Sequence, residues 1–281
     1  MANSIELFKA YAPILDEVYA KAALTAVLDG DGELARFGNA ANELVIPKMS
    51  MSGLADYDRV TGYAAGDVTM TNETVQCNYD RGRMFQIDTL DNLETASIAY
   101  GRLSGEFIRT KVAPELDAFR LATYAGQTGI GRTSGTLNDG AAVIAALRVA
   151  HAAMDEAEVP GEGRVLFITS ALKGAVDDMD TVASRAAMEM ADQIVVVPRN
   201  RFYTAISLLN NGYAKASGGK DINFMLIHPS AVIQFQKHVQ PKVIAPEQNP
   251  DADAWKFGYR TVGIADVYEN KLAGIYCHSV A

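Results

Sequence analysis

Residues 91–126 of the chain, DNLETASIAYGRLSGEFIRTKVAPELDAFRLATYAG, carry the pattern that decides the fold. Apolar side chains recur there at the three- and four-residue spacing of an amphipathic helix. They are Leu93, Tyr100, Leu103, Phe107, Ile108, Val112, Leu116 and Phe119. Asp91 suits a helix N-cap, Glu94 follows it by three positions, and Pro114 predicts a bend. A continuous helix of this length would measure about 54 Å, so the pattern predicts a flat or elongated subunit.

Length, composition and charge exclude several classes of protein. The 281 residues are 49% hydrophobic and 21% charged, which is typical of globular proteins and excludes disordered chains and disulfide scaffolds. The formal net charge is −9 and no run of Lys or Arg occurs, so we expect neither a dedicated nucleic-acid binder nor an anionic-membrane binder. Cys77 and Cys277 match no zinc or redox spacing and are expected to be intracellular thiols. No apolar run reaches the ~18 residues of a membrane span.

The segments before the long helix predict an arm and a ribbon. Residues 4–28 have apolar side chains at helical spacing and are followed by glycines, which favours a helical arm or lid. The alternative is a helix packed on its own domain. Residues 67–79 are rich in strand formers, and their apolar positions switch from even to odd numbers. A ribbon without a continuous apolar face buries little surface of its own, so we expect another subunit to cover it. The alternative is an edge hairpin of the chain's own sheet.

The segments after the long helix predict an α/β unit followed by returning strands. Within residues 136–250, apolar strands at 165–169 and 224–228 each run into a helix start, at Ser170 and Pro229. A third apolar strand covers residues 194–197. Strands within residues 255–281 are expected to return to the long helix and to complete a second domain with it.

No catalytic motif emerges from the sequence. Residues 126–133 resemble a phosphate-binding loop, but Arg132 stands where Lys is required and no buried strand precedes the loop, so it is interpreted as a flexible linker. The four histidines lie in no nucleophile motif. The acidic clusters at 177–180 and 56–58 lack a calcium-loop pattern and are interpreted as solvated turns. We therefore predict no catalytic residue, no cofactor and no metal.

Two groups of residues are candidates for contacts between subunits. Arg81, Arg83, Arg109 and Lys111 are the densest cationic positions of an acidic chain, and they flank the ribbon and the long helix. They are expected to meet carboxylates of a neighbouring subunit, with an ordinary solvated surface as the alternative. The second group, at the ribbon tip, consists of Tyr57, Arg59 and Tyr63.

Several strings of the sequence resemble the major capsid proteins of tailed bacteriophages of the siphophage type, which have the HK-ninety-seven-type shell fold. The strings are VIPKM at 45–49, DRGRMFQID at 80–88, GEFIRTKVAPELD at 105–117, AWKF at 254–257 and GIY at 274–276. The resemblance covers nearly the whole chain and implies an α+β fold. It implies an N-terminal arm at 1–40, an extended β loop at 41–88, a peripheral domain at 89–132 and 253–281, and an axial α/β domain at 133–252.

The resemblance also implies a function. Such a protein would self-assemble as pentamers and hexamers into an icosahedral shell around phage double-stranded DNA, in the host cytoplasm, and would end in the virion. The extended loop would lie over the peripheral domain of the next subunit. Expected partners are other copies of the chain, a portal, the packaged DNA without sequence-specific binding, and no membrane.

Two departures from the family carry their own expectations. The ribbon begins near residue 44, which leaves no room for a fused scaffolding segment, so a separate scaffolding protein is expected. The loop offers only Lys48 for an isopeptide bond, so no cross-linking is expected. The alternatives are an encapsulin-type nanocompartment shell and a small-molecule α/β enzyme. The enzyme is suggested by the two strands at 165–169 and 224–228, which each run into a helix start, and by the glycine loop.

Overall fold

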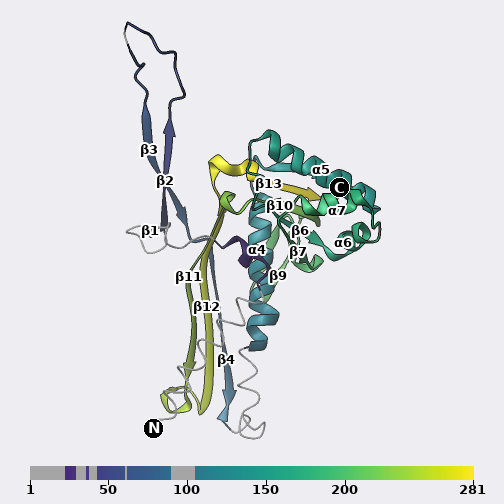
Figure 1. The fold of residues 1–281 in the computed structure, drawn as a ribbon. Helices are drawn as coiled ribbons and strands as arrows, with labels where there is room; N and C mark the ends of the chain where they lie inside the picture. Colours follow the sequence, from purple (N-terminus) through teal and green to yellow (C-terminus); the bar gives the residue numbers. More distant parts are fainter. Residues whose placement is uncertain (1–22, 30–35, 38–42, 61, 90–104) are drawn as a thin grey trace.

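The computed structural model describes residues 23–29, 36–37, 43–60, 62–89 and 105–281. The helix predicted within residues 4–28 therefore lies mostly outside the described residues, and so does the first part of the long helix, residues 91–104. The molecule is elongated. A long sheet runs beside one helix, an α/β unit lies on the other side of that helix, and a thin hairpin projects beyond both (Figure 1).

The described part of the long helix consists of a π-helical turn, Ile108–Val112, that continues into α4, Ala113–Gly126. Pro114 stands at the start of α4, directly after the π-helical turn. Proline has no N–H to donate to the carbonyl of Thr110, and the wider π turn lies at that place. Ile108, Val112 and Leu116 are buried against the long sheet, so the predicted apolar stripe faces a core.

The long sheet has three antiparallel strands in the order β11-β12-β4. Their bounds are Val232–Ile244, Ala254–Val267 and Tyr79–Asp88. The centre is β12, which pairs with β4 from Ala254↔Asp88 to Gly263↔Tyr79. Phe257 and Tyr259 of β12 are buried against the helix. Residues 79–88, grouped with the extended loop in the sequence analysis, are thus a strand of this sheet.

The α/β unit is a five-stranded sheet in the order β5-β13-β10-β6-β7. The strands are Gly131–Ser134, Ile275–Ser279, Ile222–Ile227, Val165–Thr169 and Gln193–Val197. Helices α5, α6 and α7 are Gly140–Glu156, Ser170–Asp177 and Val182–Glu189. They pack on one face against Leu166 and Phe224, whereas α4 packs on the other face against Phe167 and Met225. Both faces of the strands β6 and β10 are covered, and this explains their uninterrupted apolar sequences.

The structure corrects the predicted places of two strands. Strand β11, expected in the axial unit, pairs with β12 in the long sheet from Val232 to Ile244. Strand β13, expected to return to the long helix, lies between β10 and β5 in the α/β sheet. Residues 275–278 of β13 are all buried, as a strand covered on both faces requires. The chain therefore passes between the two units three times, whereas the predicted domain bounds require only two passages.

Two local predictions also differ from the structure. No α-helix starts at Pro229. Instead, a single 3-10 turn, Pro229–Ala231, leads directly into β11. The ring of His228 accepts the N–H of Ser230 and closes this turn. The glycine segment 126–133 is not wholly a linker, since β5 begins at Gly131 and pairs in parallel with β13. Arg132, Thr133 and Ser134 of β5 are exposed and the half-buried residue is Gly131, so the sequence of β5 carries no apolar signal.

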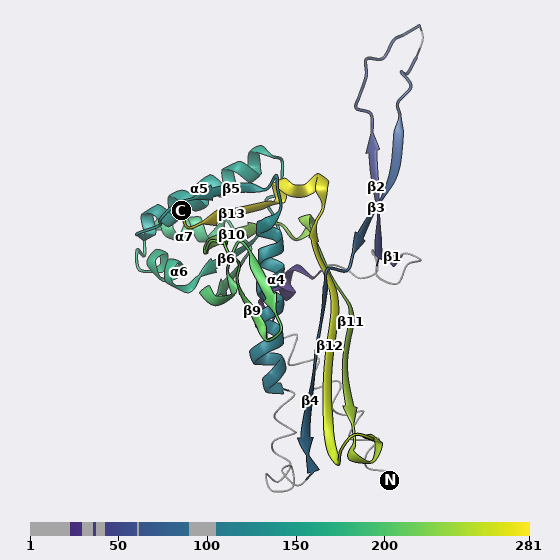
Figure 2. The ribbon, with the colours of Figure 1, turned by 180° about the vertical axis from the view of Figure 1, so that it is seen from behind.

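The predicted ribbon is present as an antiparallel hairpin of β2, Glu43–Met51, and β3, Val68–Gln76. Their register runs from Glu43↔Gln76 to Met51↔Val68, and the short strand β1, Arg36–Phe37, adds to β2. Seen from behind, the hairpin again extends away from the α/β unit and from the long sheet (Figure 2). Among the residues that the structure describes, no helix combines the length and the apolar character needed to cross a bilayer.

The remaining described elements are short. They are the hairpin β8–β9, Ile206–Leu209 and Gly212–Lys215, and the 3-10 turns η1, Leu24–Leu28, η4, Arg199–Arg201, η6, Pro246–Gln248, and η7, Glu269–Gly274. Segment 24–28 is anchored to α4 by the buried carboxylate of Asp117, which accepts the backbone N–H groups of Leu24 and Thr25 at 3.1 Å each. The β8–β9 hairpin leaves the α/β unit and reaches toward β4, which creates the groove described below.

Candidate interaction surfaces

The β2–β3 hairpin exposes large apolar side chains to solvent. Leu54, Val60 and Tyr63 are 108%, 92% and 91% exposed. Other exposed apolar side chains of the hairpin are Met49, Met51, Tyr57, Val68 and Met70. Several large apolar side chains exposed on one element are typical of a contact site, and a two-stranded ribbon alone is marginally stable in water. The hairpin therefore has the character of an element that a partner covers.

The tip of the hairpin, residues 52–67, is held by its own hydrogen bonds. The Ser52 N–H donates to the carbonyl of Asp67 at 3.0 Å, and Asp58 and Gly62 exchange backbone hydrogen bonds of 3.2 and 2.8 Å. The rings of Tyr57 and Tyr63 pack edge to face, 4.9 Å apart. These two candidate residues and Arg59 therefore occupy one small, exposed structure, and their contact with a neighbouring subunit stays a prediction.

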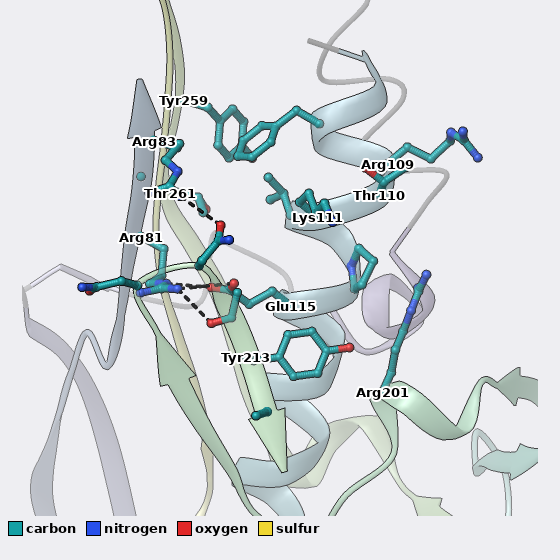
Figure 3. Close-up of a pocket in the computed structure, with 18 of the residues that line it drawn as sticks. Arg81, Arg83, Arg109, Thr110, Lys111, Glu115, Arg201, Tyr213, Tyr259 and Thr261 are labelled. Carbon is teal, nitrogen blue, oxygen red and sulfur yellow. Dashed lines mark hydrogen bonds and ion pairs between the residues drawn. The ribbon is translucent and has the colours of Figure 1, made fainter. Parts of the chain in front are cut away.

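The other four candidate residues line one groove. The groove lies between β4, the π-helical turn with the start of α4, and the β8–β9 hairpin, and its volume is about 1010 Å³ (Figure 3). Arg81 and Arg83 come from β4, and Arg109 and Lys111 come from the π-helical turn. The tertiary structure thus separates the seven candidates into a tip group and a groove group.

Arg81 joins the three walls of the groove. Its Nε lies 2.7 Å from Glu115 Oε1 on α4, and its Nη2 donates to the carbonyls of Leu209 at 2.6 Å and Gly212 at 3.3 Å. The hydrogen bond to Glu115 raises the pKa of Arg81 above its ordinary value, despite an opposing effect of burial. Tyr79 donates a further hydrogen bond to Glu115. The guanidinium of Arg81 thus already has partners within the chain, and contact with a neighbouring subunit stays a prediction.

The other cationic groups lie toward the rim of the groove. Arg83 donates to Asn211 Oδ1 at 3.0 Å, and Arg109 pairs with Glu106 at 2.7 Å, one helical turn away. Both arginines and Lys111 are exposed. Exposed ion pairs of this kind contribute little to stability, so these side chains remain available to a ligand.

Sequence reasoning missed the cationic residues that the β8–β9 region adds to the groove. Arg201 lies 3.2 Å from the buried carboxylate of Asp117, and the Tyr213 hydroxyl donates to the carbonyl of Asn200 at 2.8 Å. Burial raises the pKa of Asp117 and that of Tyr213. The sequence separates Arg201 from Arg81 by more than a hundred positions, and only the strings Arg-Asn-Arg at 199–201 and Asn-Asn at 210–211 hint at a polar surface.

Comparison with known proteins identifies the fold. No family model matches the chain, and no curated protein matches its sequence. Solved structures do match. The capsid of cyanophage P-SCSP1u is 12% identical with a TM-score of 0.58, over 88% of this chain and 85% of that one. The mature capsid of bacteriophage PhiM1 is 11% identical with a TM-score of 0.56, over 86% and 83%. The virus-like particle of Pyrococcus furiosus is 9% identical with a TM-score of 0.55, over 94% and 98%.

The chain has the HK-ninety-seven-type capsid fold. The α+β class and the resemblance to tailed-phage capsid proteins inferred from the sequence are therefore confirmed. At identities this low, the similarity establishes the fold alone. It does not assign the hairpin tip or the groove a role.

Within the capsid fold, the motifs examined for chemistry have local structural partners. Arg132 of the glycine loop donates to the carbonyls of Ala125 and Gln127, so its cation closes a turn. In the acidic cluster, Asp177 pairs with Lys173 and Asp180 pairs with Arg185. In the described part of the chain, no group of three or more His, Cys, Asp or Glu side chains has a metal-binding arrangement.

Proposed function

We propose that the chain is the structural subunit of a closed protein shell, a major capsid protein that assembles as pentamers and hexamers around phage double-stranded DNA. The observation that carries this proposal is the exposed, apolar β2–β3 hairpin on a chain with a capsid fold. In a monomeric protein such a hairpin would add little to stability, because it buries almost none of its own side chains. A shell subunit gains an interlocking contact from it, with the hairpin over the long sheet of the next subunit.

The charge of the chain supports the same function. A net charge of −9 without basic runs suits a container whose wall meets dense DNA without adhering to it. The DNA is then enclosed without sequence-specific binding, and the subunit acts without catalysis. A portal and a separate scaffolding protein are further proposed partners, and the virion is the proposed location after assembly in the bacterial cytoplasm.

The first test is electron microscopy of the purified recombinant protein, combined with light-scattering mass over a concentration series. The proposal predicts rings of five or six subunits, tubes or closed shells. A monodisperse monomer at every concentration, also with a scaffolding protein present, would refute it and would revive the small-molecule enzyme as the alternative.

A second test removes the hairpin tip alone. Residues 53–66 are replaced by Asn-Gly, which forms a two-residue turn between Ser52 and Asp67, the residues that already close the tip. We expect a folded subunit with an unchanged circular dichroism spectrum and a loss of assembly. Assembly at the normal yield would show that the tip does not interlock subunits.

The second candidate is a nanocompartment shell of the encapsulin type, because one structure with the same fold is described as a virus-like particle and not as a phage capsid. The virus-like particle from Pyrococcus furiosus matches this chain over nearly the full length of both proteins. The contents of particles from the native source discriminate the two candidates. A genome-length double-stranded DNA supports the phage capsid, whereas a protein cargo without DNA supports the nanocompartment.

A further inference from the structure

The groove concentrates positive charge in an acidic protein. Six cationic side chains and two carboxylates line it, which gives a formal charge of +4. The cations are Arg81, Arg83, Arg109, Lys111, Arg201 and Lys215, and the carboxylates are Glu106 and Glu115. Since the whole chain carries −9, the remainder of the chain carries −13. A local field of opposite sign inside a concave surface attracts an anionic ligand.

Buried hydrogen-bonding groups in the groove lack partners among the described residues. Thr261 lines the groove and is 1% exposed, and its hydroxyl oxygen has no hydrogen-bond partner in the part of the chain that the structure describes. The same holds for Nε of Arg201. Buried polar groups are nearly always paired in native proteins. Together with the charge, these groups point to a ligand that brings acceptors into the groove.

We propose that this groove is a docking site for an acidic peptide segment of a different protein, whose carboxylates bind the cationic side chains of Arg83, Lys111 and Arg201. The site is additional to the shell contacts proposed above. Aromatic side chains between the cations, among them Phe85, Phe107 and Tyr213, supply the apolar area that a peptide needs and a bare anion does not.

The shape and charge of the surroundings favour a peptide over nucleic acid. A duplex presents closely spaced phosphates along a rigid cylinder, and tight binding requires an extended basic surface. Here the cations are confined to one groove and interspersed with Glu106 and Glu115, and the rest of the chain is strongly acidic. A narrow peptide segment fits such a site, because it needs only a few carboxylates.

The pairing of this chain's own carboxylates favours a different protein over a second copy. Several exposed carboxylates elsewhere in the described chain already have a cation of the same chain nearby. Asp80 lies 2.6 Å from Arg260, Asp155 lies 2.6 Å from Arg164, and Asp251 lies 2.5 Å from Lys256. A second copy that docked through these carboxylates would have to give up such pairs, whereas a flexible acidic segment would not.

The test measures binding of a fluorescent peptide of alternating Glu and Gly, about ten residues long, to the full-length protein by anisotropy at about 50 mM salt, where surface charges are weakly screened. We expect Lys111→Glu and Arg83→Glu each to weaken binding about tenfold. The matched control Arg185→Glu makes the same charge change on α7, far from the groove, and should weaken binding less than about twofold.

Thr261→Val separates a role in ligand binding from a role in folding, because the two roles predict different changes in peptide affinity and thermal midpoint. Its hydroxyl has no partner in the described structure, so the change should leave the thermal midpoint equal or higher. If the hydroxyl contacts the ligand, peptide affinity should fall about threefold. Unchanged affinity together with the higher midpoint would contradict a ligand at this position.

The remaining outcomes each decide the proposal. No binding, or equal loss with Arg185→Glu, would overturn it. If a DNA oligonucleotide displaces the fluorescent peptide at a lower concentration than the unlabelled peptide does, the ligand is nucleic acid. Stronger binding of a peptide with residues 154–163 of this chain, which include Glu156, Glu158 and Glu162, would make a second copy the occupant. Assembly is followed separately by light scattering, so failure here leaves the proposed shell function intact.

Discussion

The five-stranded sheet of the α/β unit and the β2–β3 hairpin are both built from strands, yet they differ in what covers them. Every side chain of β6 and β10 is buried, because helices lie on both faces of that sheet. In the hairpin, the described side chains from Met49 to Met51 and from Val68 to Met70 are exposed. Burial of apolar side chains in the α/β unit therefore stabilises the folded chain, whereas the hairpin contributes little to folding and requires a partner to cover it. The predictions below test that division, from the largest expected effect on stability to the smallest.

Truncation of a core side chain in the α/β sheet should have the largest effect. Phe167 of β6 is fully buried between the sheet and α4. Phe167→Ala removes its ring and leaves a cavity, so we expect the free energy of unfolding to fall by about 3–5 kcal/mol. Urea denaturation followed by tryptophan fluorescence measures it. A loss below about 1 kcal/mol would mean that the sheet is not the main source of stability.

The ion pair at the base of the groove should have an intermediate effect. Glu115 receives Arg81 and Tyr79, and its side chain is only 11% exposed. Glu115→Gln removes the charge opposite a partly buried guanidinium, and we expect a loss of about 1–3 kcal/mol. The control is Glu106→Gln, whose pair with Arg109 is exposed on both sides and should contribute less than about 0.5 kcal/mol. Equal losses in urea denaturation would contradict the connecting role of Arg81.

A buried histidine should make the stability of the α/β unit depend on pH. Burial and the guanidinium of Arg164, 3.3 Å away, lower the pKa of His151 below its ordinary value of 6.5. Below about pH 6.5, His151 therefore binds a proton in the unfolded chain but stays neutral in the folded chain until the pH reaches its lowered pKa. This contribution to stability is complete above pH 6.5 and is lost as the pH falls below that value toward the folded-state pKa.

The histidine prediction is checked with His151→Gln. We expect the free energy of unfolding to fall less steeply between about pH 7 and pH 5 in the variant than in the wild type. One titrating group accounts for a difference in slope of at most about 1.4 kcal/mol per pH unit. Some slope should remain, because burial also lowers the pKa values of His228 and His278. Identical slopes in wild type and variant would show that His151 does not titrate differently in the two states.

A polar substitution at the hairpin tip should have the smallest effect on stability and a large effect on assembly. Val60 is 92% exposed, so Val60→Ser should change the free energy of unfolding by less than about 0.5 kcal/mol. The shell proposal predicts a clear loss of assembled particles in light scattering. Val182→Ser, at an 82% exposed position of α7, is the matched control and should assemble normally. Loss of assembly in both variants would point to a general effect of surface polarity.

The course of the chain shows how much of the fold the sequence predicts. Apolar spacing located the described part of the long helix, and uninterrupted apolar runs located β6, β7 and β10. The partners of β11 and β13 were wrong because a strand's own residues describe its faces and say little about its neighbours. Strand β5 was missed because it lies at an edge and is mostly exposed.

By itself, the sequence determined which segments form apolar helices and strands, that the ribbon lacks a continuous apolar face, and that the chain resembles a capsid protein. The first two features follow from residue type and periodicity, which are local properties of the chain, whereas the resemblance rests on the strings of sequence quoted above. Only the tertiary structure decided that Arg81, Arg83, Arg109 and Lys111 share one groove with Arg201, and that the tip residues lie far from it. The physical reason is that hydrogen bonds between distant strands bring these positions together, and their pairing depends on packing over the whole molecule.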